Sequence, residues 1–186
     1  MANRTFLISA DSPTKPKEGE RFEIICAASY MIPLFWHMLF DRTSIVRASD
    51  TIEGGETVDS YPCYSSKVSE AVARALNRWP LVEKVIGPKY IELFKTWLNH
   101  VESKSRGFLH CETYEFGQMF ELTSTFERHL DLCENALSDS NPVAESEAWQ
   151  ELLGQANVGW DGTQVNPAGT FSFAGYAWES LVPWET

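Results

Sequence analysis

The chain has 186 residues, of which 44% are hydrophobic and 13% aromatic, and its formal net charge is −11. This apolar content excludes a disordered chain, and the length suits one domain with a core of its own. The acidic balance excludes an electrostatic nucleic-acid binder and a polybasic membrane surface, so we expect neither direct nucleic-acid binding nor membrane association.

The first predicted elements are two strands and a buried helix. Residues 4–9 and 21–27 have the pattern of short β-strands, and a turn-rich loop over residues 11–19 allows them to pair as a hairpin. The most apolar stretch, residues 31–40, is too short to span a bilayer. With Pro33 in its first turn, it predicts a helix that is buried on most sides.

Two further helices are predicted after a polar connecting loop over residues 51–61. Ser66 is expected to cap the first of them, whose apolar residues recur at helical spacing up to Trp79, and Pro80 is expected to end it. The second begins at a Gly-Pro pair and runs over residues 87–101. The first helix also carries a basic stripe made of Lys67, Arg74 and Arg78. We expect this stripe either to be solvated or to offset the acidic half of the chain within the molecule.

The third quarter of the chain is predicted to contain both strand and helix. Residues 108–122 indicate a strand, a turn and a second strand. Ser124 and Glu127 have the spacing of a capping box, which begins a helix with an apolar stripe behind it. Asn141 and Pro142 are expected to cap and start the helix after that.

The last thirty residues differ in composition from the rest of the chain, because glycine, proline and aromatic residues recur in them. Residues 171–178 predict a strand with a bulge at Gly175. The predicted fold is therefore α+β, a single domain over residues 1–186 with four or five helices packed on a small, mostly antiparallel sheet. The aromatic-rich segment 157–186 is expected to pack back on this domain.

The charge is distributed unevenly along the chain. Residues 1–106 carry 14 basic and 13 acidic residues, whereas residues 107–186 carry 13 acidic residues and the single base Arg128. Acidic residues recur one helical turn apart on the helix predicted over residues 125–137, opposite its apolar stripe. With those of the next helix they form the predicted acidic face, which comprises Glu127, Asp131, Glu134, Glu145, Glu147 and Glu151.

Such an acidic face is typical either of a solubilising surface or of a docking surface for a basic partner. The common catalytic and nucleotide-binding motifs are absent from the sequence, including the nucleophile elbow, the P-loop and the zinc-protease helix. We therefore expect a binding protein with no cofactor, namely an immunity-type or antitoxin-type inhibitor that occludes a basic toxic enzyme. A nucleic-acid mimic, with carboxylates in the place of phosphates, is an alternative.

An enzyme of another kind is the remaining hypothesis. Cys63 lies just before a predicted helix, whose dipole could lower the pKa of the thiol and make it a nucleophile. A metal site is the other possibility, since two histidines and two cysteines suit tetrahedral zinc: His110, Cys111, His129 and Cys133. The spacing is not that of a zinc finger, and buried cysteines are commonly core residues.

Three segments carry a resemblance to a known family. They are Ala2-Asn3-Arg4-Thr5-Phe6-Leu7, Ser29-Tyr30-Met31-Ile32-Pro33-Leu34 and Gly117-Gln118-Met119-Phe120-Glu121-Leu122. The chain resembles a small bacterial family whose members open with Ala-Asn-Arg-Ser/Thr-aromatic-Leu and carry a later Tyr-x-Ile-Pro-Leu stretch. The resemblance implies a bacterial, single-domain protein and brings no activity or site residues with it. Because the first residues lack a long apolar run, we expect a cytoplasmic location.

Overall fold

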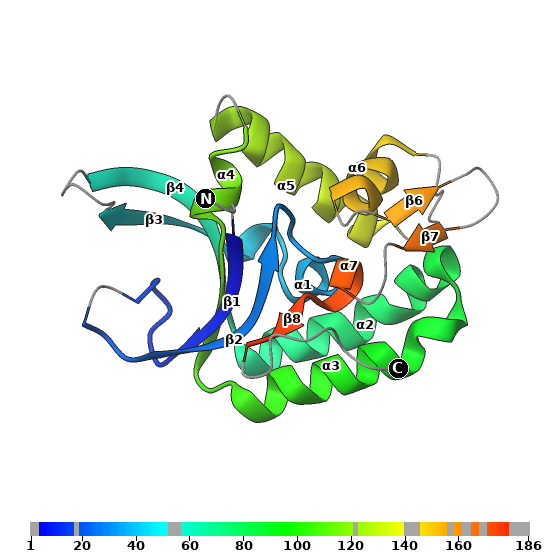
Figure 1. Ribbon diagram of the computed structural model, residues 1–186, viewed down its shortest axis with the longest axis horizontal. Helices are drawn as coiled ribbons and strands as arrows, with labels where there is room; N and C mark the ends of the chain where they lie inside the picture. Colours follow the sequence, from blue (N-terminus) through cyan, green and yellow to red (C-terminus); the bar gives the residue numbers. More distant parts are fainter. Residues whose placement is uncertain are drawn as a thin grey trace.

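The structure is a computed structural model that describes residues 4–16, 19–51, 57–120, 123–139, 146–155, 158–160, 165–167 and 171–178. A six-stranded sheet with the order β3-β4-β5-β1-β2-β8 lies beside a group of helices (Figure 1). Every strand pair in the described part of the chain is antiparallel. The α+β class and the antiparallel sheet are therefore confirmed. Within the described residues, no helix is both long and apolar enough to cross a membrane.

The centre of the sheet joins distant parts of the chain. Strands β1 (Arg4–Ala10) and β2 (Phe22–Ser29) form the predicted hairpin, with a register shift between Leu7 and Ile8. Strand β5 (Phe108–Glu112) pairs with the other edge of β1. The predicted hairpin and the first strand of the 108–122 segment are thus confirmed.

The predicted loop over residues 51–61 is wrong, because the structure has a hairpin there. Strand β3 (Ile45–Thr51) pairs with β4 (Thr57–Lys67), and β4 also pairs with β5. Strand β4 contains many polar residues, so its sequence lacks the apolar alternation that predicts a strand. Pro62 lies beyond the end of the β4–β5 ladder, where a residue without an N–H is tolerated.

Helix α1 (Leu34–Leu39) lies at the centre of the core, as its apolar composition predicts. All of its side chains are buried. The ring of Phe35 has its centroid 6.1 Å from that of Trp79, 5.4 Å from those of Phe94 and Trp97, and 5.6 Å from that of Phe173. These contacts join α1 to α2 (Val68–Ile86), α3 (Ile91–Lys104) and α7 (Phe171–Ala174).

Helix α2 continues through Pro80, so the predicted end of this helix is wrong. Pro80 is exposed, and water can therefore hydrogen-bond the carbonyl that its missing N–H leaves free. The buried stripe also continues on the opposite side, with Val82 and Ile86, and its burial outweighs the cost of the proline. Lys67 rather than Ser66 is at the N-cap, without a side-chain capping bond. Helix α3 follows a short 3₁₀ turn, Pro88–Tyr90, close to the prediction.

The acidic half contains more helix than its sequence pattern indicates. A short helix, α4 (Tyr114–Gly117), replaces the second predicted strand and buries Phe116. Helix α5 (Thr123–Ser138) already contains Ser124, so this residue is not at the capping position. Helix α6 (Glu147–Gln155) follows, and Asn141 and Pro142 lie outside the described residues. The apolar stripe of α5 is buried as predicted.

The predicted bulged strand over residues 171–178 is partly wrong, because α7 occupies its first half and only Tyr176–Ala177 form a strand, β8. A helical turn there buries Phe173 against Phe35, and the Trp36 indole N–H donates to the carbonyl of Ala174 over 2.9 Å. Strand β8 pairs with β2 at the edge of the sheet. Two short strands, β6 (Val158–Trp160) and β7 (Val165–Pro167), form a separate pair.

Gly175 should be intolerant of any side chain. Its φ is +72°, and an added Cβ would lie 2.7 Å from the carbonyl oxygen of Ala27 and 2.9 Å from the Trp36 ring. We expect Gly175→Ala to lower the free energy of unfolding by roughly 2 kcal/mol or more, measured by urea denaturation. Gly154→Ala is the matched control in helix α6, where an added Cβ meets nothing within 4 Å and helix propensity favours alanine by about 0.5–1 kcal/mol. Equal effects at the two sites would contradict this prediction.

Candidate functional site

Each described residue of the predicted acidic face contacts a basic side chain of the same chain. On α5, Glu127 pairs with Arg47, Asp131 lies 3.0 Å from Arg42, and Glu134 lies 2.7 Å from Arg78. On α6, Glu147 lies 2.9 Å from Arg128, and Glu151 lies 2.8 Å from a ring nitrogen of His129. Glu145 lies outside the described residues.

These ion pairs change the interpretation of the acidic face. The arginines that meet α5 come from the first half of the chain, so contacts between elements offset the repulsion between acidic residues along the helix. A basic partner that docked on these carboxylates would have to displace or share the arginines already bound to them. These three ion pairs therefore join α5 to elements of the first half of the chain.

Two of the three residues of the basic stripe are largely buried rather than solvated, and Arg78 offsets a carboxylate of the acidic half, as the second interpretation predicts. Arg78 donates to the carbonyls of His37 and Phe40 and to both carboxylate oxygens of Glu134. Arg74 donates to the carbonyl of Leu39 over 2.6 Å. The carbonyl of His37 already accepts from the N–H of Phe40, whereas the carbonyls of Leu39 and Phe40 lie past the last helical hydrogen bond, and the two guanidinium groups supply their donors. Of the stripe, only Lys67 is largely exposed.

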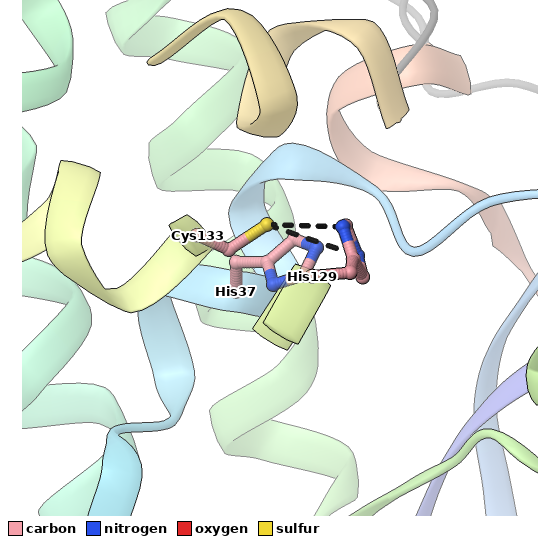
Figure 2. Close-up of side chains that lie close together, drawn as sticks. All are labelled: His37, His129 and Cys133. Carbon is pink, nitrogen blue, oxygen red and sulfur yellow. Dashed lines mark hydrogen bonds between the residues drawn. The ribbon is translucent and has the colours of Figure 1, made fainter. Parts of the chain in front are cut away.

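A compact group of donor atoms lies where α1 meets α5. His129 and Cys133 are one turn apart on α5, as their spacing predicts, and His37 of α1 joins them (Figure 2). One ligand atom from each of the three residues lies within 4.8 Å of the others. The Cys133 Sγ is 3.7 Å from both ring nitrogens of His129. We refer to these three residues as the His-Cys cluster.

Burial controls the protonation of the cluster. His37 is 3% exposed and Cys133 is 1% exposed. Desolvation, together with the nearby His129 and Arg78, lowers the pKa of His37 well below its usual value, so the imidazole is neutral. Its Nε2 is buried without a hydrogen-bond partner among the described residues. Desolvation, reinforced by nearby glutamates, raises the pKa of Cys133 well above its usual value, so the thiol keeps its proton.

His110 and Cys111 do not belong to this cluster. His110 lies on β5 and makes a 3.0 Å hydrogen bond between its Nε2 and the carbonyl of Ser12. Cys111 is a buried core residue on the same strand. The four-residue set suggested by the sequence is thus divided, and among the described residues the group that could hold a metal is the His-Cys cluster. The sequence alone did not identify His37 as a site residue. Its position inside the most apolar stretch of the chain was the available signal, because a buried neutral imidazole needs a polar partner.

Cys63 does not have the properties of an activated nucleophile. It lies within β4 rather than in a loop before the helix, and it is buried. Desolvation by burial, with the nearby Glu112 carboxylate, raises the pKa of its thiol from 9.0 to about 12. The hypothesis that a helix dipole lowers this pKa is therefore wrong.

We expect Cys63 to be unreactive in the native protein. A thiol reagent at pH 8 should modify it only as fast as the protein unfolds, whereas denatured protein should react at once. Because its pKa is higher in the folded state than in the unfolded state, the Cys63 contribution to stability is complete below about pH 9. It is lost as pH rises toward 12. Urea titrations across this range should show a shallower alkaline decline for Cys63→Ala; rapid native labelling of wild-type Cys63 would contradict the prediction.

Comparison of the chain with protein-family models, with curated proteins and with solved structures gives no match.

Proposed function

We propose that this chain binds zinc through the His-Cys cluster. The observation that carries the proposal is the convergence of three ligand atoms within 4.8 Å in the core, one of them from a histidine whose buried Nε2 has no other partner in the described structure. Two imidazoles and one thiolate form a borderline-soft donor set that suits zinc better than calcium or magnesium.

The separation of the two donors on α5 is compatible with tetrahedral coordination. Zinc–nitrogen and zinc–sulfur bonds of about 2.0–2.3 Å place neighbouring ligand atoms roughly 3.3–3.8 Å apart. The separation between Cys133 Sγ and the His129 nitrogens, 3.7 Å, falls in this range. Three protein donors leave a fourth position for water or another ligand. Because the cluster is buried between α1 and α5, a bound ion would link these two helices.

Zinc would replace a proton at Cys133. The raised pKa of this thiol means that the metal-free protein carries S–H, so binding forms a zinc–sulfur bond and releases one proton to solvent. The neutral His37 needs no deprotonation to bind through its lone pair. Zinc binding at Cys133 therefore competes with the proton of this thiol.

Titration of metal-free protein with zinc, against a chelator of known affinity, tests the proposal. We expect one equivalent of zinc to bind, and cobalt(II) in its place should give visible bands with a sulfur-to-cobalt charge-transfer band. Cys133→Ala should abolish stoichiometric binding and the charge-transfer band. Cys63→Ala, which removes another buried thiol, should leave both unchanged. Absence of zinc binding to the wild type, or equal binding by Cys133→Ala, would overturn the proposal.

The excess of negative charge supports a second candidate function, the binding of a basic protein. The chain has 26 acidic and 15 basic residues, so no pattern of ion pairs can neutralise it. A field of one sign speeds association with a partner of opposite charge. We therefore retain, as a proposal, an inhibitor of the bacterial immunity or antitoxin type whose target is a basic toxic enzyme. The same negative field supports the alternative function of a nucleic-acid mimic, whose partner would be a protein that normally binds nucleic acid.

This second proposal predicts a partner that is retained from a host lysate at low salt and released at high salt. The association rate with the purified partner should then fall in the double variant Glu127→Lys and Asp131→Lys, which are both on α5. Glu92→Lys on α3 is the control for each single α5 reversal, because it changes the net charge by the same amount, and it should have a smaller effect than either. A partner whose binding ignores both salt and the α5 reversals would exclude this mechanism.

A further inference from the structure

Glu151 of α6 lies beside the His-Cys cluster without belonging to it. Its Oε1 is 2.8 Å from Nδ1 of His129, and its side chain is 32% exposed whereas that of His129 is 1% exposed. The carboxylate of Glu151 therefore lies at the protein surface and contacts the buried imidazole of His129. It also lies close enough to Cys133 to raise the pKa of that thiol.

The distances within the cluster do not by themselves decide which nitrogen of His129 binds a metal, because Sγ of Cys133 is equally far from both. The hydrogen bond to Glu151 decides it. An ionised carboxylate accepts a hydrogen bond and cannot donate one, so in the neutral ring Nδ1 donates to Glu151 and the lone pair lies on Nε2, 3.7 Å from Sγ of Cys133.

We propose that Glu151 is the positioning residue of the zinc site. It fixes the tautomer and the ring orientation of His129 so that Nε2 is the metal donor beside Cys133. This inference rests on the proposed zinc binding. Carboxylate–histidine–zinc arrangements of this kind increase ligand basicity, and their loss costs metal affinity.

The surroundings of His129 strengthen this role. The ring of Phe120 is stacked on His129 at a centroid distance of 5.6 Å, and the ring of Phe126 lies at 6.1 Å with an interplanar angle of 16°. These aromatic faces keep water away from the imidazole, and a charge interaction in such an apolar environment is stronger than in water. Zinc with a single thiolate retains one positive charge, which the carboxylate of Glu151 balances.

Glu147, on the same helix, provides the control. It lies 2.9 Å from Arg128, and both side chains are more than two-thirds exposed. Glu147→Ala removes an equal charge from α6 without touching the cluster, so it separates a positioning effect from a loss of charge on that helix.

Zinc affinities of the full chain, measured by chelator competition, test the inference. We expect Glu151→Ala to raise the Kd for zinc about 10–100-fold and to shift the visible bands of the cobalt(II) form. Glu151→Gln should recover part of the affinity, since its amide oxygen still accepts from Nδ1–H. Glu147→Ala should match the wild type in both measurements.

The outcomes separate the two proposals. If the wild type binds no zinc, the proposed function and this inference both fail. If the wild type binds zinc and Glu151→Ala has the same Kd and the same cobalt spectrum, zinc binding stands and the role of Glu151 is overturned. A Glu147→Ala variant that loses as much affinity as Glu151→Ala would also overturn it, since the effect would then be one of net charge.

Discussion

Free zinc at a thousandfold excess over its Kd should raise the free energy of unfolding by about 4 kcal/mol. The physical reason is linkage: folding brings His37 of α1 to His129 and Cys133 of α5, whereas in the unfolded chain His37 is far from these two residues. Urea denaturation of the metal-free and zinc-loaded protein measures the difference. A strong chelator should reverse it.

The stabilisation should depend on the cluster and on no other thiol. Cys133→Ala should show little response to zinc, and Cys63→Ala should respond as the wild type does. Hydrogen exchange offers a local view, because amides in both α1 and α5 should gain protection when zinc is bound. A zinc response that survives in Cys133→Ala would place the metal elsewhere in the chain.

Arg78→Ala should lower the free energy of unfolding by about 3–5 kcal/mol. The side chains of Arg78 and Glu134 are only 11% and 16% exposed, so loss of the arginine leaves a largely buried carboxylate without its cation. It also leaves the carbonyls of His37 and Phe40 without this donor. Urea or thermal denaturation measures the loss, and circular dichroism checks that the variant is folded.

The matched control is Arg128→Ala, which breaks an ion pair of similar length between side chains that are 72% and 71% exposed. Solvent screening limits such a pair to roughly 0–1 kcal/mol. The double variant Arg78→Ala and Glu134→Ala should lose less stability than the two single variants together, since neither charge is then stranded. Equal losses in Arg78→Ala and Arg128→Ala would show that burial does not strengthen the inner pair.

Local patterns in the sequence were sufficient for several elements. The strands β1 and β2 and the apolar stripe of α5 follow from periodicity and turn residues, because each needs only contacts between near neighbours in the chain or one buried face. The buried helix α1 follows from its apolar composition on every side. The same reasoning failed at Pro80, where the packing of Val82 and Ile86 continues the helix past a residue that locally disfavours it. It failed again at β4, whose polar residues are held in place by two neighbouring strands.

The sequence by itself determined the negative charge of the C-terminal half and the helical spacing that brings His129 beside Cys133. Only the tertiary structure decided which residues contact these acidic side chains and the His129–Cys133 pair. Arg42, Arg47 and Arg78 reach the carboxylates of α5 from elements far away in the chain and form ion pairs with them. His37 completes the cluster for the same reason: α1 packs on α5 through long-range contacts that no local period encodes.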